Sequence, residues 1–244
     1  MILTAHQPAY LPWLGLFHKI ALADIFVSFD CVQYLPKEWQ NRNLIKTPKG
    51  PLWLTVPVLR KGYQEYVIAD LRIDNSVPWK RKHLKSLILN YEAAPYFHMY
   101  RSFLEEAYRR DWSMLAQLDE YILRSLLEFL GISTKVVRAS SYEFRGKKSD
   151  LVLDMCKKMG ADIYIFGSQG IAYADVDSFR RERIEPLFQN YIHPQYPQQF
   201  GSFVSHLSVI DLLANCGDQS LDVLMSGNIC REDIEERDRS GGVE

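Results

Sequence analysis

The chain of 244 residues is 47% hydrophobic and 24% charged, which is enough to bury a full core and unlike a disordered composition. Its 29 Lys and Arg residues nearly balance 30 Asp and Glu residues, which argues against a dedicated nucleic-acid-binding protein. The four cysteines form no CxxC pair, no apolar run reaches about 18 residues, and no signal-peptide pattern is present, so we expect free thiols, no membrane insertion and a cytoplasmic location.

The N-terminus predicts a strand, a proline turn and a helix. Residues 2–4 are a short apolar run suited to a buried strand, which Pro8 should end because proline lacks an amide hydrogen. Pro12 fits the first turn of a helix whose apolar stripe comprises Trp13, Leu16, Phe17, Ile20 and Ala21. A second buried strand, 25–29, completes a β-α-β unit. Parallel α/β sheets usually bind ligands where such strands end, and the polar residues there are His6, Gln7 and Asp30.

The segment after Asp30 is dense in amide, cationic and aromatic side chains, and we expect it to be a loop. The guanidinium of Arg42 offers a rigid fork for a carboxylate or phosphate, and neighbouring amides can bind the remaining oxygens. Interleaved Tyr34 and Trp39 favour a binding site over the alternative, a solvated loop. The residues predicted to bind a ligand here are Gln33, Asn41, Arg42, Asn43 and Lys46.

The rest of the chain predicts one α/β core with a helical insertion. Residues 52–58 are β-branched and aromatic and predict a buried strand. Three apolar stripes at helical spacing place a helical insertion or side layer at 76–131. Strands at 135–137 and 161–166 resume the α/β pattern, so we predict a three-layer, doubly wound parallel sheet formed by 1–75 and 132–230, with residues 2–4 central. The charged tail 231–244 is expected to be frayed.

Two further segments contain candidate site residues. Residues 167–170 follow the last strand, where small residues such as Ser168 let a ligand approach the backbone, although an ordinary turn is the alternative. Ser208 and Asp211 have the spacing of a helix capping box. His193 has no such structural explanation. Two other histidines, His83 and His98, are expected at the surface or boundary of the helical insertion.

Five motifs occur in order and together resemble the WbqC-like family. They are His6-Gln7-Pro8-x-Tyr10-Leu11-Pro12-Trp13-x-Gly15, Asp30-x-Val32-Gln33-Tyr34, Asn41-Arg42-Asn43-x-Ile45-Lys46, Trp53-Leu54-Thr55-Val56-Pro57 and His193-Pro194-x-Tyr196-x-Gln198. The resemblance spans nearly the whole chain. It implies a bacterial protein linked to surface-polysaccharide (O-antigen) gene clusters, and it leaves the reaction undefined.

The first strand, turn and helix also resemble the first half of nucleotidyltransferases and of pantothenate-synthetase-type amide ligases, which have a nucleotidyltransferase/HUP-like architecture. In those enzymes, groups at the first strand–helix turn face the phosphates of ATP. This chain departs from their usual pair of histidines, because His18 lies too far along the helix. The resemblance implies ATP as a cofactor, with magnesium as an open option.

We therefore expect an enzyme that forms an amide, by ATP-dependent acyl or aminoacyl transfer to a nucleotide-linked amino sugar. The alternative is a non-catalytic module that binds a sugar nucleotide or a partner of the same pathway. The residues expected to face one cleft are His6, Asp30 and His193 as catalytic groups, and Gln7, Tyr10, Gln33, Asn41, Arg42, Asn43, Lys46, Ser168 and Tyr196 as binding groups. No zinc-ligand spacing is present. The expected partner is a sugar nucleotide or another anionic small molecule rather than nucleic acid. The oligomeric state stays open.

Overall fold

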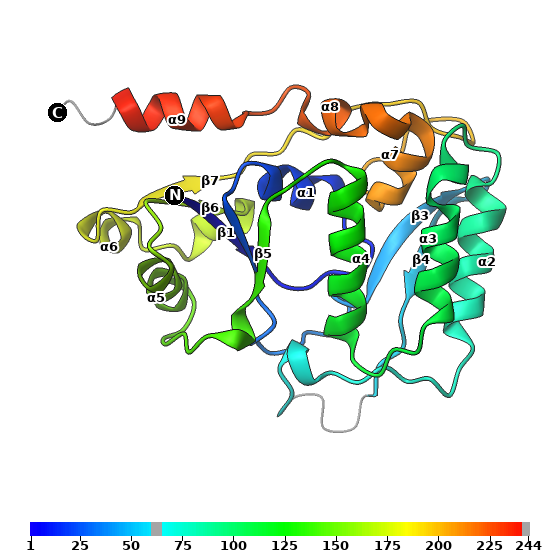
Figure 1. Cartoon of the computed structure of the whole chain (residues 1–244), viewed down its shortest axis with the longest axis horizontal. Coiled ribbons are helices and arrows are strands. Elements are labelled where there is room, and N and C mark those ends of the chain that lie inside the picture. Colours follow the sequence, from blue (N-terminus) through cyan, green and yellow to red (C-terminus); the bar gives the residue numbers. More distant parts are fainter. Residues whose placement is uncertain (60–64, 241–244) are drawn as a thin grey trace.

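The computed structural model describes residues 1–59 and 65–240. Within these ranges, five strands form one parallel sheet in the order β5-β2-β1-β6-β7 (Figure 1). The strands are β1 (Ile2–His6), β2 (Ile25–Ser28), β5 (Lys135–Arg138), β6 (Ile163–Phe166) and β7 (Glu185–Phe188). The prediction of a parallel sheet with residues 2–4 at its centre is confirmed.

The edge strand β7 is one strand that the sequence did not predict. It lies next to β6 at one end of the sheet and contains Pro186. Proline cannot donate a ladder hydrogen bond, so it is tolerated at a sheet edge and disfavoured in a central strand. The sequence of this four-residue strand, with a charged residue and a proline, therefore does not predict a strand. Residues 185–188 are extended because they pair with β6.

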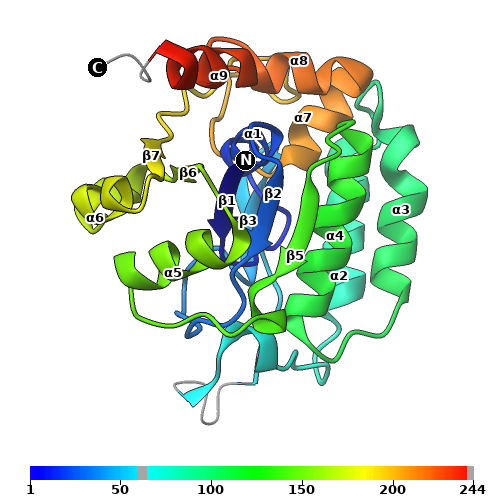
Figure 2. The ribbon, with the colours of Figure 1, turned by 60° about the vertical axis from the view of Figure 1, so that its left-hand side comes forward.

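Helices cover both faces of the sheet (Figure 2). One face carries α1 (Leu14–Ala21) and α4 (Leu115–Phe129), and the other carries α5 (Ser149–Met159) and α6 (Val176–Arg181). Side chains alternate along a strand. Leu3 and Ala5 accordingly pack in one cluster with α5 and α6, whereas Ile2 packs in another with Leu22. This is the three-layer α/β architecture that the sequence predicts.

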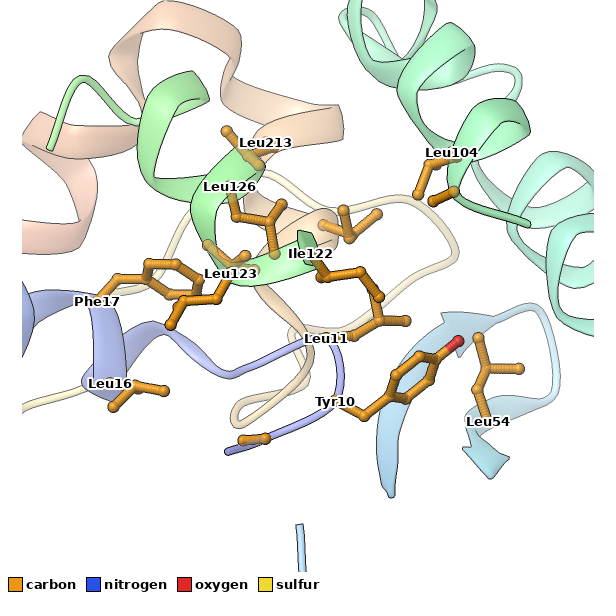
Figure 3. Packing of buried hydrophobic residues seen from close by; sticks show 14 of the residues in the cluster. Tyr10, Leu11, Leu16, Phe17, Leu54, Leu104, Ile122, Leu123, Leu126 and Leu213 are labelled. Atoms are coloured by element: carbon orange, nitrogen blue, oxygen red, sulfur yellow. The ribbon is translucent and has the colours of Figure 1, made fainter. Parts of the chain in front are cut away.

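The largest apolar cluster lies between α1, α4 and the turn formed by residues 6–13, called the 6–13 turn below. Figure 3 shows Leu123 and Leu126 of α4 beside Phe17 of α1, with Tyr10 pointing toward Leu54. All five side chains are buried. Burying one such side chain contributes roughly 1.5–3 kcal/mol, so this cluster fixes α4 against the turn that follows the central strand.

A hairpin and two helices lie beyond α4. They are β3 (Arg42–Thr47), β4 (Gly50–Thr55), α2 (Trp79–Tyr91) and α3 (Phe97–Arg109). The expected loop at 42–46 is wrong, because β3 pairs antiparallel with β4 and Gly50, at φ +102°, lets the chain turn back. The expected buried strand at 52–58 is confirmed in part, because β4 covers residues 52–55 and Leu54 is buried. Leu52 and Trp53 are each 41% exposed, because one face of this two-stranded sheet is uncovered.

The remaining elements are short. They are η2 (Ile68–Asp70), η3 (Ala139–Ser141), η4 (Ser168–Ala172), α7 (Val209–Cys216), η5 (Gly217–Gln219), α8 (Ser220–Met225) and α9 (Arg231–Ser240). A frayed segment was expected from Arg231, but residues 231–240 form α9. Its Ile234 is 2% exposed, and Arg231 pairs with Asp24 at 2.6 Å, which explains its order.

Two sequence expectations concern the chain as a whole. The four cysteines are free, as predicted. In the part of the chain that the structure describes, none of the helices combines the length and apolarity that crossing a membrane requires.

Gly170 in η4 offers a test of how closely this turn packs on the sheet. A Cβ atom at Gly170 would lie 2.6 Å from Cβ of Phe166, which is 1% exposed. We expect Gly170→Ala to lower the free energy of unfolding by roughly 1–3 kcal/mol through overpacking, measured by urea denaturation. Gly167→Ala is the matched control, because its new Cβ would meet only Nζ of Lys19 at 3.9 Å. Equal losses in both variants would contradict this packing.

Candidate functional site

The carboxyl ends of the parallel strands meet along one edge of the sheet. His6 lies opposite Ser28, and Phe166 lies opposite Phe188. In chain order the strands run third, second, first, fourth and fifth across the sheet, so the direction of winding reverses between β1 and β6. Open α/β sheets bind ligands at such a reversal. The residues that follow the two strands there are Gln7 and Gly167.

His6 ends β1 beside this reversal. Its Nδ1 lies 2.7 Å from the carbonyl oxygen of Gln7, so Nδ1 carries the hydrogen and Nε2 is left as an acceptor. Burial and, to a smaller extent, the charge of Lys19 lower the pKa of His6 to about 4. The imidazole is therefore neutral near pH 7. It suits a proton acceptor rather than the cationic phosphate ligand that a histidine at a strand end can also be.

Lys19 of α1 contributes a cation beside this edge. It is 3% exposed, and its Nζ donates to the carbonyl oxygen of Ala5 at 2.9 Å. Burial lowers its pKa to about 8, so the ammonium is still mostly charged near pH 7. Among residues 1–59 and 65–240, no ion pair to Lys19 is found. A buried cation without a counter-ion is costly, so this position suits an anionic ligand.

The turn after β6 completes the edge on the other side of the reversal. Ser168 is exposed and begins η4, which matches its predicted place after the last central strand. A Cβ atom at Gly167 would lie 3.9 Å from Nζ of Lys19. His6, Lys19 and Ser168 therefore approach the same sheet edge from β1, α1 and η4.

The 6–13 turn is held from two other parts of the chain, the segment around Trp39 and Gln40 and the start of α7. The amide nitrogen of Tyr10 donates to the carbonyl oxygen of Trp39 at 3.1 Å, and Val209 N donates to Pro12 O at 2.8 Å. The side-chain amide of Gln40 also donates to the side-chain carbonyl of Gln7. The segment around Trp39 and Gln40 is thus fixed directly against Gln7, as a loop beside a ligand edge should be.

Arg42 forms an aromatic platform with Trp39 and Trp53 at this loop. The Arg42 guanidinium lies 4.3 Å from the centre of the Trp53 ring and donates to the carbonyl oxygen of Lys37. The two tryptophan rings are 5.3 Å apart, and both side chains are about two-fifths exposed. Nε of Arg42 is buried without a hydrogen-bond partner. Exposed aromatic rings beside a guanidinium suit a planar or sugar ring that carries negative charge.

Three predicted site residues serve the fold instead. Asp30 is 2% exposed and accepts hydrogen bonds from Ser140 N at 2.8 Å and Ser140 Oγ at 2.7 Å. Asn41 donates to Val56 O and Asn43 to Leu11 O, each at 2.7 Å. Their polar groups are bound within the protein, so the expectation that they face a ligand does not match the structure.

Lys46 and Tyr196 belong to a buried network that the sequence did not indicate. Lys46 Nζ donates to Gln198 Oε1 at 3.0 Å and to Ser202 O at 2.6 Å. The hydroxyls of Tyr91 and Tyr196 donate to the two carboxylate oxygens of Asp211 at 2.9 and 3.0 Å. This network ties β3 and α2 to the segment before α7, and it leaves little capacity for a ligand.

The helix cap at Ser208 is only half as predicted. Its side chain accepts from Ile210 N, so Ser208 caps α7. The expected return bond, from the amide nitrogen of Ser208 to the carboxylate of Asp211, is absent from the described contacts, because Ser208 N donates to Leu44 O at 2.9 Å. The carboxylate of Asp211 accepts from two tyrosine hydroxyls instead.

Tyr10 was predicted to bind a ligand, yet its hydroxyl is buried among helices. It lies 2.9 Å from Nδ1 of His83 and contacts the hydroxyl of Tyr108. His83 is therefore a core residue rather than a surface or boundary one, whereas His98 is exposed as expected. Burial lowers the pKa of His83 to about 4, so it is neutral near pH 7.

His193 lies in an aromatic cluster that touches the start of α1. Its ring is 5.2 Å from that of His206, which stacks on Trp13 at 5.5 Å. Nδ1 of His193 lies 2.9 Å from Pro194 O, and Nε2 is buried without a partner. Burial lowers its pKa, and His206 lowers it further. The remaining predicted residue, Gln33, is exposed and bridges to Val67.

The sequence did not single out two groups that the structure makes prominent, Lys19 and Asp119. Both are charged residues in helices, where a solvated position is the ordinary expectation. The available signal was the composition of α1, in which only His18 and Lys19 interrupt an apolar run, as in helices buried on all sides. Within the described ranges, no group of three or more His, Cys, Asp or Glu residues is placed to hold a metal ion.

Residues 7–223 match the sequence profile described as the WbqC-like protein family. The chain is also 33% identical over 228 residues to the uncharacterized protein Rv1507c of Mycobacterium tuberculosis. That alignment covers 93% of this chain and 97% of the relative. No solved structure matches the chain.

Lys19→Met tests whether the buried ammonium is kept for binding rather than stability. We expect the variant to be at least as stable as the wild type near pH 7, because an apolar side chain replaces a buried charge. Burial lowers the pKa of Lys19 from 10.5 in the unfolded chain to about 8 in the folded one. Below pH 8 the folded state therefore bears the cost of a buried charge, and above pH 10.5 Lys19 is neutral in both states and this cost is gone. At about 1.4 kcal/mol per pKa unit, wild-type stability should therefore rise by roughly 3 kcal/mol relative to Lys19→Met over that window.

Urea denaturation at several pH values measures this difference. Lys85→Met is the matched control, because Lys85 is exposed. His18→Gln is unsuitable as a control, because His18 is also buried. A loss of several kcal/mol in Lys19→Met at pH 7, about what breaking a buried pair costs, would show that Lys19 is a structural residue.

Proposed function

We propose that this chain, which belongs to the WbqC-like protein family, forms an amide bond between an ATP-activated carboxylic acid and the amino group of a nucleotide-linked amino sugar. The pathway would be the synthesis of bacterial surface-polysaccharide precursors. The observation that carries this proposal is Lys19, a buried ammonium beside the sheet reversal that pairs with no carboxylate among the described residues.

The charges at the sheet edge support an anionic ligand. Lys19 would bind phosphate oxygens next to Gly167, where the missing side chain lets a ligand approach. This replaces the role that the sequence suggested for Lys46, whose ammonium is occupied by Gln198 and Ser202. Fixed donors of this kind stabilise charge that develops in a transition state, because they need no reorganisation during the reaction.

ATP would supply the leaving group: the substrate carboxylate displaces pyrophosphate from the α-phosphorus, and the amine then displaces AMP and loses one proton. His6 is placed to accept that proton at Nε2, since Nδ1 already donates to Gln7 O. A bound anion would raise the low pKa of His6 toward neutrality, because an opposite charge favours the protonated ring. Such general-base assistance is worth roughly 100-fold to 10,000-fold in rate.

The platform of Arg42, Trp39 and Trp53 would bind the sugar-nucleotide acceptor. Two exposed indole rings offer a stacking surface for a base or sugar ring, and the guanidinium offers a cation for its diphosphate. The Gln40–Gln7 contact holds this platform beside His6. The acceptor and the activated acid would thereby reach the same turn.

A non-catalytic sugar-nucleotide-binding module is the second candidate. Its supporting observation is that both carboxylate oxygens of Asp30, one of the predicted catalytic groups, accept hydrogen bonds from Ser140 within the protein. Such a module would use the same aromatic platform and Lys19. It would bind the ligand without releasing AMP.

Incubation of the protein with ATP, UDP- and dTDP-linked amino sugars and a set of small acids and amino acids tests the reaction. We expect an amide product with equimolar AMP and pyrophosphate. His6→Ala and Lys19→Met should lower the rate at least ~100-fold, the lower end of what a general base or an oxyanion donor contributes. The exposed His98→Ala and Lys85→Met should retain the rate. Mass spectrometry of the product and a pyrophosphate assay give the readout.

Three outcomes separate the candidates. Amide formation from an acyl thioester without ATP would replace ATP-dependent ligation with simple acyl transfer. A sugar nucleotide that raises the melting temperature without any product would favour the binding module. If no nucleotide raises the melting temperature, both the amide-forming enzyme and the sugar-nucleotide-binding module are contradicted.

A further inference from the structure

Asp119 of α4 is a buried carboxyl group. It is 1% exposed, and within residues 1–59 and 65–240 neither of its oxygens accepts a hydrogen bond. It lines a cavity of about 10 Å³, enough for one water-sized group, together with residues of the 6–13 turn, α1, β2 and α4. They are Gln7, Pro8, Ala9, Pro12, Leu16, Phe26, Ser28, Glu120 and Leu123.

The other polar groups around the cavity do not serve Asp119. The carboxylate oxygens of Glu120 are paired with Arg124 and Arg138. The nearby hydroxyl of Tyr10 is bound to His83 and Tyr108. The side-chain carbonyl of Gln7 accepts from Gln40, and neither Gln7 nor Ser28, which also lines the cavity, donates a hydrogen bond to Asp119. The carboxyl of Asp119 is therefore the group in this cavity that still requires a donor.

The size and polarity of the cavity select the occupant. Buried polar groups in proteins are almost always hydrogen-bonded, so an occupant with donors is expected here. An ammonium group is about as large as a water molecule and carries three N–H donors for two carboxylate oxygens. An apolar group would leave both oxygens unbound.

We infer that this cavity binds the ammonium group of the acyl donor, which would make that donor an amino acid. The identity of the donor rests on the proposed function. Gln7 lines the cavity, and His6 is the residue before it in the chain, so the cavity lies next to the end of β1. In an amino acid the ammonium and the carboxylate are separated by one carbon atom. An ammonium beside Asp119 would therefore present the carboxylate near His6, and the reaction would be aminoacyl transfer.

Binding should be coupled to release of a proton. Burial raises the pKa of Asp119 well above its ordinary value, so the empty cavity holds a neutral carboxyl. A cation that enters ionises it, and the proton leaves to solvent. The affinity for an amine that stays protonated should therefore rise with pH until Asp119 is ionised in the free protein.

Methylammonium is the first probe, because it tests the cavity without the reaction. Methylammonium chloride should raise the melting temperature of the wild type above that in tetramethylammonium chloride at the same ionic strength, since the larger ion cannot enter. Calorimetry in two buffers should show release of one proton. Asp119→Asn should abolish the difference, and the exposed Asp177→Asn should retain it. If Asp119→Asn does not fold, the pH dependence in the wild type decides. Equal melting temperatures in the two salts would overturn the inference.

The second test uses amino acids and their analogues without the amino group. The wild type should form amide from amino acids at least ~100-fold faster than from the matching des-amino acids, because a site built to bind a polar group rejects an analogue that lacks it. Equal rates would overturn the inference and leave the proposed function standing. If methylammonium binds in a way that depends on Asp119 but no acid gives an amide product, the proposed function is wrong and the ammonium site still stands.

Discussion

The structure depends on the 6–13 turn, whose backbone holds an unfavourable conformation against partners from distant parts of the chain. Leu11 has φ +45°, a region that costs a non-glycine residue about 1–2 kcal/mol, and it is wholly buried. Its carbonyl oxygen accepts from the side chain of Asn43, and the flanking Tyr10 and Pro12 bind Trp39 and Val209. These contacts explain why polar residues in separate motifs act structurally: they hold the turn.

Two buried ionisable groups lie near this turn without an ion-pair partner among the described residues. Lys19 reaches Ala5, just before the turn, from α1, and Asp119 reaches the turn from α4; both helices lie on the same face of the sheet. Neither group adds to stability, since burial disfavours the charged form of each. A fold usually retains such groups only where a ligand compensates them, and perturbed ionisable groups accordingly gather at functional sites.

The sequence predicted the elements that periodicity and proline control, and it failed where tertiary contacts decide. The central strand, α1 and the polar edge at His6 follow from local pattern. Asn41 and Asn43 looked like ligand groups because an amide at a loop gives no sign of a carbonyl partner elsewhere in the chain. Lys19 was overlooked for the converse reason, because an ordinary lysine on a helix is solvated. Burial of a polar residue is a property of the whole fold.

The contacts of the 6–13 turn also set the order in which a newly made chain becomes competent. Pro12 leaves the ribosome early, whereas its partner Val209 is synthesised about 200 residues later. At roughly 5–20 residues per second, the turn waits on the order of ten to forty seconds for that contact. The contact between Pro12 and Val209 therefore forms only after residue 209 has been made, and a chain that stops short of it would expose apolar residues of α1 that chaperones recognise.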